Sequence, residues 1–419
     1  MLIIYRLLIN FIFIISPIVI IFRLIRKKES FLRFKEKYCL FSEKRNSGKV
    51  IWFHGASVGE IKSVIPLIEK ITKNKKIKQI LITSNTLSSS KIIKSIKSKK
   101  IIHQFFPIDA NFLTKRFIKY WKPSAAFFID SEIWPNMFCN LNKTKISIIL
   151  IYVIILINAR ITKKTFKRWK KIKVFATTLF GYIDLCLSSN KESINYLKNL
   201  GSKNIKFIGN LKYAQSENEV FKLNKRFAQS IFGRKIWCAS STHNLEEEFC
   251  GKVHKLLKAS YKNLLTVIIP RHIERTNNII ERLNNQNLNI QILSNTKFIN
   301  RETDILIVNA YGKTKHFFSI IKDVFLGGSL IKHGGQNPLE AARFGCNIYH
   351  GPNIYNFNEI YKFLSDQKFS KKIKNINSLV KELKLNLSKK SDPKKLIKKI
   401  NVLGKEILNN TFKELRIYL

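Results

Sequence analysis

The chain has 419 residues, of which 45% are hydrophobic, and it contains only 9 Pro and 16 Gly. This composition excludes a disordered or collagen-like chain and is typical of a globular protein with room for two domains of ordinary size. The 76 Lys and Arg residues exceed the 27 Asp and Glu residues by 49 charges, which favours a polyanionic partner such as anionic lipid, a phosphorylated substrate or nucleic acid.

The first predicted element is the apolar segment "LLINFIFIISPIVIIF", Leu7–Phe22. Counted from Met1, it is about long enough to cross a bilayer as one helix. No small-x-small cleavage site follows, which argues against a cleaved signal peptide. The cations that come directly after it favour a cytoplasmic location for the remainder. We therefore expect residues 1–28 to form a single membrane anchor, while Pro17 leaves an interfacial helix as the alternative.

Short β-branched runs then alternate with helical patterns such as Asn111–Trp121. This alternation predicts βαβ units and a parallel sheet. The predicted strands are Lys49–His54, Gln79–Ser84, Ser124–Asp130 and Ile146–Ile157.

A polar stretch, Tyr213–Arg226, interrupts this pattern and predicts an interdomain linker. Alternation resumes with predicted strands at Lys235–Ser241, Leu264–Pro270, Asp304–Val308, Asp323–Ser329 and Asn347–Gly351. We therefore expect an N-terminal Rossmann-like domain over 29–212, the linker over 213–226 and a second Rossmann-like domain over 227–419. Ligands of doubly wound folds bind beyond the carboxyl ends of the strands, so we expect a site in a cleft that the two domains face.

The stretch "IWFHGASVGE" places Ser57 three residues before Glu60, after a predicted strand. This spacing is typical of a capping box, in which Ser and Glu satisfy backbone N–H groups at a helix start. The sequence leaves open whether Glu60 is only a cap or also an acid–base group at the mouth of a site.

Other polar clusters also follow predicted strands. Asp130 and Glu132 follow one strand, Asn158 and Arg160 follow the long apolar run, and Asn210 and Lys212 follow "IKFI". In the second half the motifs "SSTHNLEEE", "PRHIER" and "GGSLIKHGGQNPLEAA" each close a strand and open a helix. This repeated placement predicts a site at the carboxyl edges of both sheets.

The stretch "GGSLIKHGGQNPLEAA" resembles an anion site. Its glycines let backbone approach a ligand closely, and Asn337 and Pro338 suit the start of a helix with free N–H groups. Glu340 could bond a ribose hydroxyl, and Arg271 in "PRH" could grip a phosphate. The alternative is a tight Gly turn followed by a capped helix.

The six cysteines lie far apart, without a C-x-x-C pair, and His54 and His243 are isolated. This spacing favours a reducing compartment without structural disulfides. It predicts no metal site, and we expect no cofactor.

Seven motifs follow one another along the chain: "WFHGASVGE", "EIWPN", "NARIT", "GNLKY", "ASSTHNLEEE", "IIPRHIER" and "GGSLIKHGGQNPLEAARFG…GPNIYNF". Together they resemble the family of 3-deoxy-D-manno-octulosonic acid (Kdo) transferases of lipopolysaccharide assembly. The resemblance implies a GT-B glycosyltransferase fold with an N-terminal anchor at the cytoplasmic face of the inner membrane. It also implies metal-independent, inverting transfer of Kdo from CMP-Kdo to the lipid A precursor, lipid IVA.

The resemblance also implies roles for particular residues. The general base falls on Glu60, and the auxiliary charged residues fall on Asp130 and Lys212. The CMP contacts fall on Pro270, Arg271, Tyr311, Gly312, Lys313, Asn337, Pro338, Leu339 and Glu340. Secondary candidates for the site are Glu132, Ser57, Arg160 and Ser329.

The chain departs from the family pattern at four positions. Asp130 and Lys313 stand where the family has Glu, Gln336 where it has His, and Leu245 where it has Gly. Alternative functions are a GT-B transferase for another nucleotide sugar and a degenerate, non-catalytic membrane-associated homologue. Nucleic acid is not an expected partner, because the cations are spread along the chain without a nucleic-acid-binding motif. Anionic membrane lipid is an expected partner.

Overall fold

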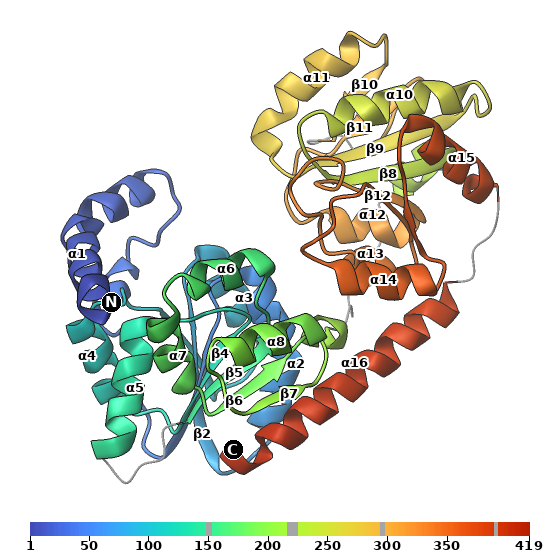
Figure 1. The fold of residues 1–419 in the computed structure, drawn as a ribbon. Coiled ribbons are helices and arrows are strands. Elements are labelled where there is room, and N and C mark those ends of the chain that lie inside the picture. Colours follow the sequence, from blue (N-terminus) through green and yellow to red (C-terminus); the bar gives the residue numbers. More distant parts are fainter. Residues whose placement is uncertain (148–152, 216–224, 294–297, 389–392) are drawn as a thin grey trace. The chain divides into compact units, whose positions relative to one another are not determined.

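The computed structural model describes residues 1–147, 153–215, 225–293, 298–388 and 393–419 (Figure 1). The chain forms two compact units. Unit 1 consists of Met1–Ser216 and Leu403–Leu419, and unit 2 consists of Glu217–Val402.

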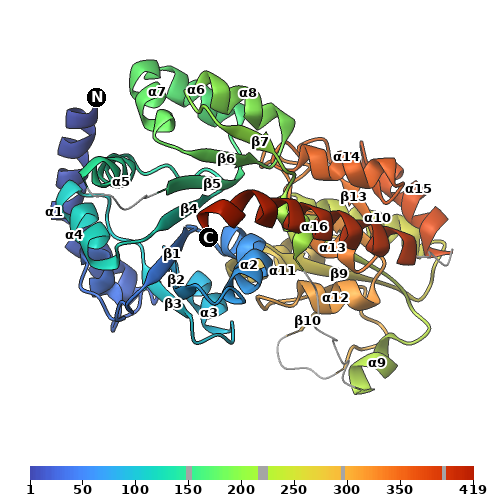
Figure 2. The same ribbon diagram turned by 90° about the horizontal axis from the view of Figure 1, so that it is seen from below.

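Unit 1 contains a seven-stranded parallel sheet in the order β3-β2-β1-β4-β5-β6-β7 (Figure 2). The first strand therefore lies between β2 and β4. The chain proceeds from β1 through β2 to β3, then returns to β4 on the other side of β1 and continues outward, which makes β1/β4 the topological switch point. The strands are β1 (Lys49–His54), β2 (Ile77–Ser84), β3 (Ile101–Phe105), β4 (Ala125–Ile129), β5 (Val153–Ala159), β6 (Leu185–Ser188) and β7 (Ile205–Phe207).

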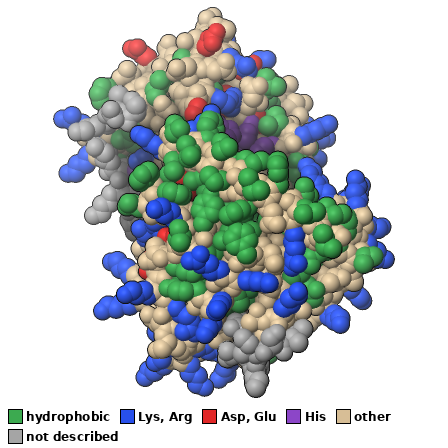
Figure 3. All heavy atoms as spheres, turned by 90° about the vertical axis from the view of Figure 1, so that its left-hand side faces the viewer, with side chains coloured by type: hydrophobic (Ala, Val, Ile, Leu, Met, Phe, Trp, Pro, Cys, Tyr) green, Lys and Arg blue, Asp and Glu red, His purple; other side chains and the backbone are tan. Residues whose placement is uncertain are grey.

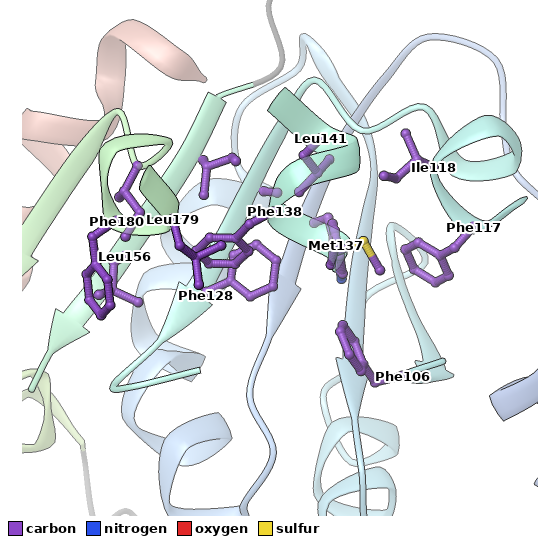
Figure 4. Packing of buried hydrophobic residues seen from close by; sticks show 14 of the residues in the cluster. Phe106, Phe117, Ile118, Phe128, Met137, Phe138, Leu141, Leu156, Leu179 and Phe180 are labelled. Carbon is purple, nitrogen blue, oxygen red and sulfur yellow. The ribbon is translucent and has the colours of Figure 1, made fainter. Parts of the chain in front are cut away.

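Helices cover this sheet and bury its apolar side chains. Figure 4 shows part of that core, where Phe128 of β4 lies beside Phe138 of α5 with ring centroids 4.7 Å apart. The helical elements are α1 (Leu2–Ile25), η1 (Phe34–Tyr38), α2 (Val58–Thr72), α3 (Leu87–Lys94), α4 (Asn111–Trp121), α5 (Pro135–Ser147), α6 (Lys163–Lys170), α7 (Lys173–Gly181), α8 (Lys191–Asn199) and η2 (Leu211–Ala214).

Unit 2 has a second seven-stranded parallel sheet, in the order β10-β11-β9-β8-β12-β13-β14, with its switch point at β8/β12. Its strands are β8 (Lys235–Thr242), β9 (Leu264–Pro270), β10 (Ile290–Ile292), β11 (Ile305–Ile307), β12 (Asp323–Leu326), β13 (Asn347–His350) and β14 (Ser370–Lys372). Its helical elements are α9 (Lys225–Ile231), α10 (Glu246–Lys258), η3 (Ile273–Arg275), α11 (Thr276–Asn284), α12 (Thr314–Ile320), α13 (Leu339–Arg343), α14 (Asn358–Asp366) and α15 (Ile376–Leu387). Helix α16 (Lys394–Leu415) begins in unit 2 and ends in unit 1, to which η4 (Arg416–Tyr418) also belongs.

The predicted pair of doubly wound α/β units is confirmed, but most of the predicted strands have different bounds in the structure. The predicted strand Ile146–Ile157 begins too early, because α5 runs to Ser147 and β5 begins at Val153; residues 148–152 lie outside the described part of the chain. An unbroken apolar run does not distinguish a buried helix end from a strand by periodicity. Most of the predicted linker, residues 216–224, also lies outside the described residues.

The C-terminal boundary of the second domain is also corrected, because Leu403–Leu419 belongs to unit 1. Along this part of α16, Ile407, Thr411 and Leu415 are buried. Gly209 leaves room for Ile407, whose Cδ1 lies 2.9 Å from the position that a Cβ on Gly209 would occupy. A helical pattern in the sequence shows an apolar face but does not say which sheet that face covers.

Helix α1 is the one described helix that is long and apolar enough to cross a membrane, with a mean hydropathy of 2.5. Only 11% of its most apolar window is buried within unit 1. It lies beside α4 in both ribbon views (Figures 1 and 2), and Ile9 and Phe13 pack against the core of unit 1.

Candidate active site

Glu60 lies at the first turn of α2, directly beyond the carboxyl end of β1. The predicted capping box is confirmed: Glu60 N donates to Ser57 Oγ at 3.3 Å, and Ser57 N donates to Glu60 Oε2 at 3.3 Å. Ala56 N donates to the same oxygen at 2.7 Å. These bonds fix the orientation of the carboxylate. A Cβ built on Gly59 would meet no atom within 4 Å, so the backbone next to Glu60 borders open space.

The surroundings of Glu60 shift the pKa of its carboxyl group towards neutral pH. Burial, followed by the negative charges of Glu132 and Asp130, raises the pKa of Glu60 to about 7, although hydrogen bonds from Ser57 oppose this. A carboxylate with a pKa near the working pH is suited to general acid–base chemistry.

Asp130 is brought to the same edge of the sheet by the end of β4. Its backbone has a φ of +58°, and its carboxylate accepts a hydrogen bond from Asn158 Nδ2. Lys212 Nζ lies 3.6 Å from Asp130 Oδ2 in an ion pair whose side chains are largely buried. Asn158 also accepts from Leu211 N at 2.9 Å, so one amide joins the ends of β4 and β5 to η2. The structure thus brings the three predicted catalytic residues to one sheet edge.

Glu132 is held by two aromatic side chains. Trp134 Nε1 donates to Glu132 Oε2 at 2.9 Å, and His54 Nε2 lies 3.3 Å from the same oxygen. Because burial lowers the pKa of His54 and a carboxylate can only accept, the neutral ring donates through Nε2. Thr83 Oγ1 lies 2.9 Å from His54 Nδ1, so the buried ring has partners on both nitrogens.

At the switch point of unit 2, a buried carboxylate accepts hydrogen bonds from backbone N–H groups of the glycine turn, residues 327–330. Glu246 accepts hydrogen bonds from His243 N, Gly328 N, Ser329 N and Leu330 N at 2.7–3.1 Å. The side chain of Ser329 is itself used internally, because it donates to Leu326 O and accepts from Gly351 N. The N–H groups of Gly328, Ser329 and Leu330 are therefore not available to a ligand.

Three histidines surround this turn. The ring of His243 lies 4.3 Å from that of His333 and 5.9 Å from that of His272, between ring centroids. Burial, followed by His333, His272 and Arg271, lowers the pKa of His243 to about 4. Gln336 Nε2 lies 3.3 Å from His243 Nε2, so this departure from the family pattern contacts the histidine cluster.

The remaining predicted contacts of unit 2 also follow strand ends. Arg271 is exposed after β9, and its backbone N donates to Thr242 O at 3.0 Å. Tyr311 is 63% exposed and donates to Glu274 Oε1 at 3.1 Å, and a Cβ on Gly312 would meet no atom within 4 Å. Lys313 occupies the N-cap position of α12 without a side-chain capping bond.

Helix α13 starts one residue later than the predicted N-cap Asn337 and first helical residue Pro338 imply. Leu339 N donates to Asn337 Oδ1 at 3.2 Å, although Pro338 is the N-cap residue and α13 starts at Leu339. Glu340 Oε1 lies 3.4 Å from Thr314 Oγ1, which connects α13 to α12. Pro270 ends β9 and is buried.

Asn158 and Glu246 are two residues to which the sequence analysis assigned no particular role. Each side chain makes hydrogen bonds to residues far away in the chain. Asn158 bonds to the Asp130 carboxylate and to Leu211 N, and Glu246 accepts from the backbone N–H groups of residues 328–330. A signal for Asn158 existed in its place after a strand, but a signal for Glu246 did not, because three successive glutamates looked alike.

Comparison with known proteins yields one family model and several relatives. The model described as 3-deoxy-D-manno-octulosonic-acid transferase (kdotransferase) matches residues 32–215. The 3-deoxy-D-manno-octulosonic acid transferase of Rickettsia bellii is 33% identical over 353 residues, which cover 81% of this chain and 80% of that protein. The transferase of the same name from Haemophilus influenzae is 30% identical over 305 residues, which cover 72% of this chain and 70% of that protein.

Among solved structures, UDP-GlcNAc 2-epimerase from Neisseria meningitidis bound to UDP-GlcNAc is similar with a TM-score of 0.59. It is 12% identical, and the match covers 88% of this chain and 99% of that one. At this identity the likeness shows the fold alone, and it agrees with the two doubly wound units of a GT-B fold.

Proposed function

Because the chain belongs to the family of 3-deoxy-D-manno-octulosonic acid (Kdo) transferases, we propose that it transfers Kdo from CMP-Kdo to the lipid A precursor, lipid IVA. We place the reaction at the cytoplasmic face of the inner membrane, without a metal and with inversion at the anomeric carbon. We assign the general base to Glu60 because the capping box orients its carboxylate and because its pKa is raised to about 7.

In the proposed reaction an acceptor hydroxyl attacks the anomeric carbon of Kdo from the face opposite CMP. The new carbon–oxygen bond forms as the bond to the CMP phosphate oxygen breaks, and CMP leaves with that electron pair. The hydroxyl proton passes to the Glu60 carboxylate. A carboxylate whose pKa is raised to about 7 suits a base that must take up the proton and release it afterwards.

Asp130 and Lys212 are proposed to act as a charged pair beside this base. The 3.6 Å ion pair keeps the Lys212 ammonium fixed near Asp130, and the Asn158 amide holds the carboxylate from the other side. Asp130 has the same charge as the Glu that the family has at this position, and the ion pair shows that its shorter side chain still reaches Lys212.

The donor is proposed to bind at the carboxyl edge of the sheet in unit 2. Arg271 supplies an exposed guanidinium for a phosphate or carboxylate, and Tyr311 and Gly312 supply an accessible surface beside it. Asn337, Pro338, Leu339 and Glu340 would contact CMP from the start of α13. Since Glu246 occupies the N–H groups of Gly328, Ser329 and Leu330, this proposal uses side chains, and not those N–H groups, for the phosphate.

Membrane association is proposed to depend on α1, whose exposed side is apolar. The many cations of the chain would add attraction to anionic lipid of the inner membrane.

The test is a transfer assay with the purified full chain, CMP-Kdo and lipid IVA, in which products are identified by mass. We expect a mass increase corresponding to Kdo, and turnover lower by roughly 100-fold or more in the Glu60→Gln variant. UDP-sugars in place of CMP-Kdo test the alternative donor. Transfer from a UDP-sugar but not from CMP-Kdo, or binding without transfer, would overturn the proposal.

A further inference from the structure

Helix α1 is tied to unit 1 by polar bonds at its N-terminal end. Tyr5 OH donates to the buried Asp109 at 2.7 Å, and Arg6 Nε donates to Asn136 Oδ1 at 3.0 Å. A second guanidinium nitrogen of Arg6 donates to Asn111 Oδ1 at 3.2 Å. These partners lie just before α4 and at the starts of α4 and α5, so the first turns of α1 are fixed to the body of unit 1.

The middle and the end of α1 are held in the same way. Ser16 Oγ and Tyr38 OH share a hydrogen bond of 2.8 Å, and the ring of Phe13 packs edge-on against Tyr38. Near the C-terminal end, Arg23 Nε donates to the buried Glu29 at 2.7 Å. A helix held along its whole length cannot cross a bilayer without taking the polar residues beside it into the hydrocarbon, where their unsatisfied groups would be costly. The geometry therefore favours an orientation in the plane of the membrane.

The opposite side of α1 is a broad apolar surface. Twelve apolar side chains of this helix are 50–75% exposed. Phe31 and Leu32 continue the surface with exposures of 78% and 88%, and Val174 at the start of α7 is 85% exposed. Figure 3 shows hydrophobic side chains gathered on this face of unit 1 with Lys and Arg around them. A contiguous patch of this kind marks an interaction surface.

The charges around this surface fit an anionic membrane. Residues 1–28 contain no Asp or Glu, and Glu29 and Glu36 are buried and paired with Arg or Lys. Residues 160–183 likewise contain no Asp or Glu, and α6 with the start of α7 presents exposed cations. The exposed cations of this segment are Lys163, Lys164, Lys167, Arg168, Lys170, Lys171 and Lys173.

A cavity lies where the N-terminal end of α1 meets α5 and α7. Its volume is about 270 Å³, and its walls include Met1 and Leu2 of α1, Cys139 of α5, and Phe175 and Leu179 of α7. The exposed side chain of Val174 also lines it, so the cavity adjoins both the apolar surface and the cations of α6. The volume lies just below the range of about 300–1,000 Å³ for pockets that hold a drug-sized ligand, so it suits one hydrocarbon chain and not a whole glycolipid.

We propose that α1 lies in the plane of the membrane and that this cavity takes up one acyl chain of an anionic phospholipid, whose headgroup contacts the cations of α6 and α7. Apolar walls beside a cluster of exposed cations match the two parts of such a lipid. The inference rests on the proposed membrane association but not on Kdo transfer. Uptake of a lipid chain is measured without donor or acceptor, so its failure is distinguishable from failure of the transferase reaction.

The probe is phosphatidylglycerol with a diazirine at the end of one acyl chain, mixed into phosphatidylethanolamine nanodiscs that carry the full-length protein. After illumination, crosslinked residues are located by peptide mass mapping. We expect adducts on residues 174–182 as well as on the exposed side of α1. With a phosphatidylcholine probe that carries the same chain, adducts on residues 174–182 should be several-fold fewer. Adducts confined to α1, or equal with both headgroups, would overturn the proposal.

The matched variant is Thr178→Trp, which places an indole in the cavity from its exposed wall. It should reduce adducts on α7 at least five-fold without changing those on α1. The control is Asn199→Trp, which adds the same side chain at an exposed position of α8 that does not line the cavity. Equal adducts on α7 in both variants would contradict the cavity site. If Thr178→Trp lowers the melting temperature, the variant is not informative. The comparison of the two headgroups, which uses the unaltered chain, is then the deciding test.

Discussion

Ser57 Oγ donates a hydrogen bond to Glu60 Oε1 at 2.9 Å, while Glu60 N donates to Ser57 Oγ at 3.3 Å. The serine therefore caps α2 and orients the carboxylate at the same time. A cap requires only an oxygen that accepts hydrogen bonds, whereas a general base must also accept a proton. The two roles of Glu60 are compatible, and they can be separated by substitution.

Glu60→Gln should keep the fold and lose the activity. The Gln oxygen can still accept from the backbone N–H groups, so the free energy of unfolding should change by no more than about 1 kcal/mol. Turnover should fall roughly 100-fold or more, because an amide cannot take up the proton. Denaturant unfolding and the transfer assay check these two outcomes. A variant with nearly normal turnover would leave Glu60 as a cap only, and Asp130 and Glu132 would become the candidates for the base.

Activity should depend on pH through Glu60, and Glu132 should set the position of that dependence. Since the pKa of Glu60 is raised to about 7, the base is protonated below that pH, and kcat/KM should rise through about pH 7 and level off above it. Glu132→Gln removes a negative charge that raises this pKa, so the rise should move to lower pH. Glu69→Gln, at an exposed position of the same helix, is the control and should leave the profile unchanged. An unshifted profile in Glu132→Gln would show that Glu132 does not act on the base.

The same raised pKa has a consequence for stability. The folded state binds the Glu60 proton more tightly than the unfolded state does, so this group contributes stability at low pH that is lost as pH rises towards and through about 7. Glu60→Gln should flatten this part of the stability profile, measured by denaturant unfolding across the pH range.

Arg271→Ala should weaken CMP binding by roughly 1.5–3 kcal/mol if the guanidinium makes a charge-assisted bond to the nucleotide. Titration calorimetry with CMP measures this, and Arg301→Ala is the control because Arg301 is also exposed in unit 2.

Lys313→Glu, which restores the family residue, should leave CMP binding unchanged or improve it. It should also favour α12, since a negative charge near a helix N-terminus is stabilising. A large loss of affinity would instead assign Lys313 to the phosphate.

Glu246→Gln should destabilise unit 2. The buried carboxylate accepts four backbone hydrogen bonds, and the amide would direct an N–H₂ group at some of these donors. We expect a loss of roughly 2–4 kcal/mol in the free energy of unfolding, from two or more weakened bonds to a charged acceptor. Glu248→Gln is the matched control on the same helix, where a partly exposed pair with Arg282 should contribute less than about 1 kcal/mol. Equal losses in both variants would contradict the structural role of Glu246.

The orientation of α1 can be tested with an epitope tag joined to Met1. A helix that crosses the membrane, with the remainder cytoplasmic, would expose the tag on the outer side, where protease removes it from intact spheroplasts. We expect the tag to be protected until the cells are lysed, because the bonds of Tyr5, Ser16 and Arg23 hold α1 against unit 1. A cytoplasmic fusion partner at Leu419 serves as the protected control. Cleavage in intact spheroplasts would establish a crossing helix.

The sequence by itself predicted most of the central strands and their alternation with helices, but not strands such as β3, β6, β10 and β14. Lys49–His54, Asn111–Trp121 and Leu264–Pro270 occur with the predicted bounds, because a buried parallel strand needs a continuous apolar run and a surface helix needs apolar residues at helical spacing. The capping box at Ser57 and Glu60 was also predictable, since its partners are three residues apart. The place of the polar clusters after strand ends followed from the rule for doubly wound folds.

Only the tertiary structure decided which distant groups meet. Strand order places Glu60 and Asp130 at neighbouring ends, and Asn158 joins Asp130 to Leu211, because hydrogen bonds between residues far apart in the chain depend on the assembled sheet. The same holds for Glu246, which occupies the N–H groups of Gly328, Ser329 and Leu330, more than 80 residues later in the chain. The orientation of α1 also required the fold: hydropathy measures how apolar a segment is, whereas the bonds of its polar residues determine whether it leaves the domain or lies along it.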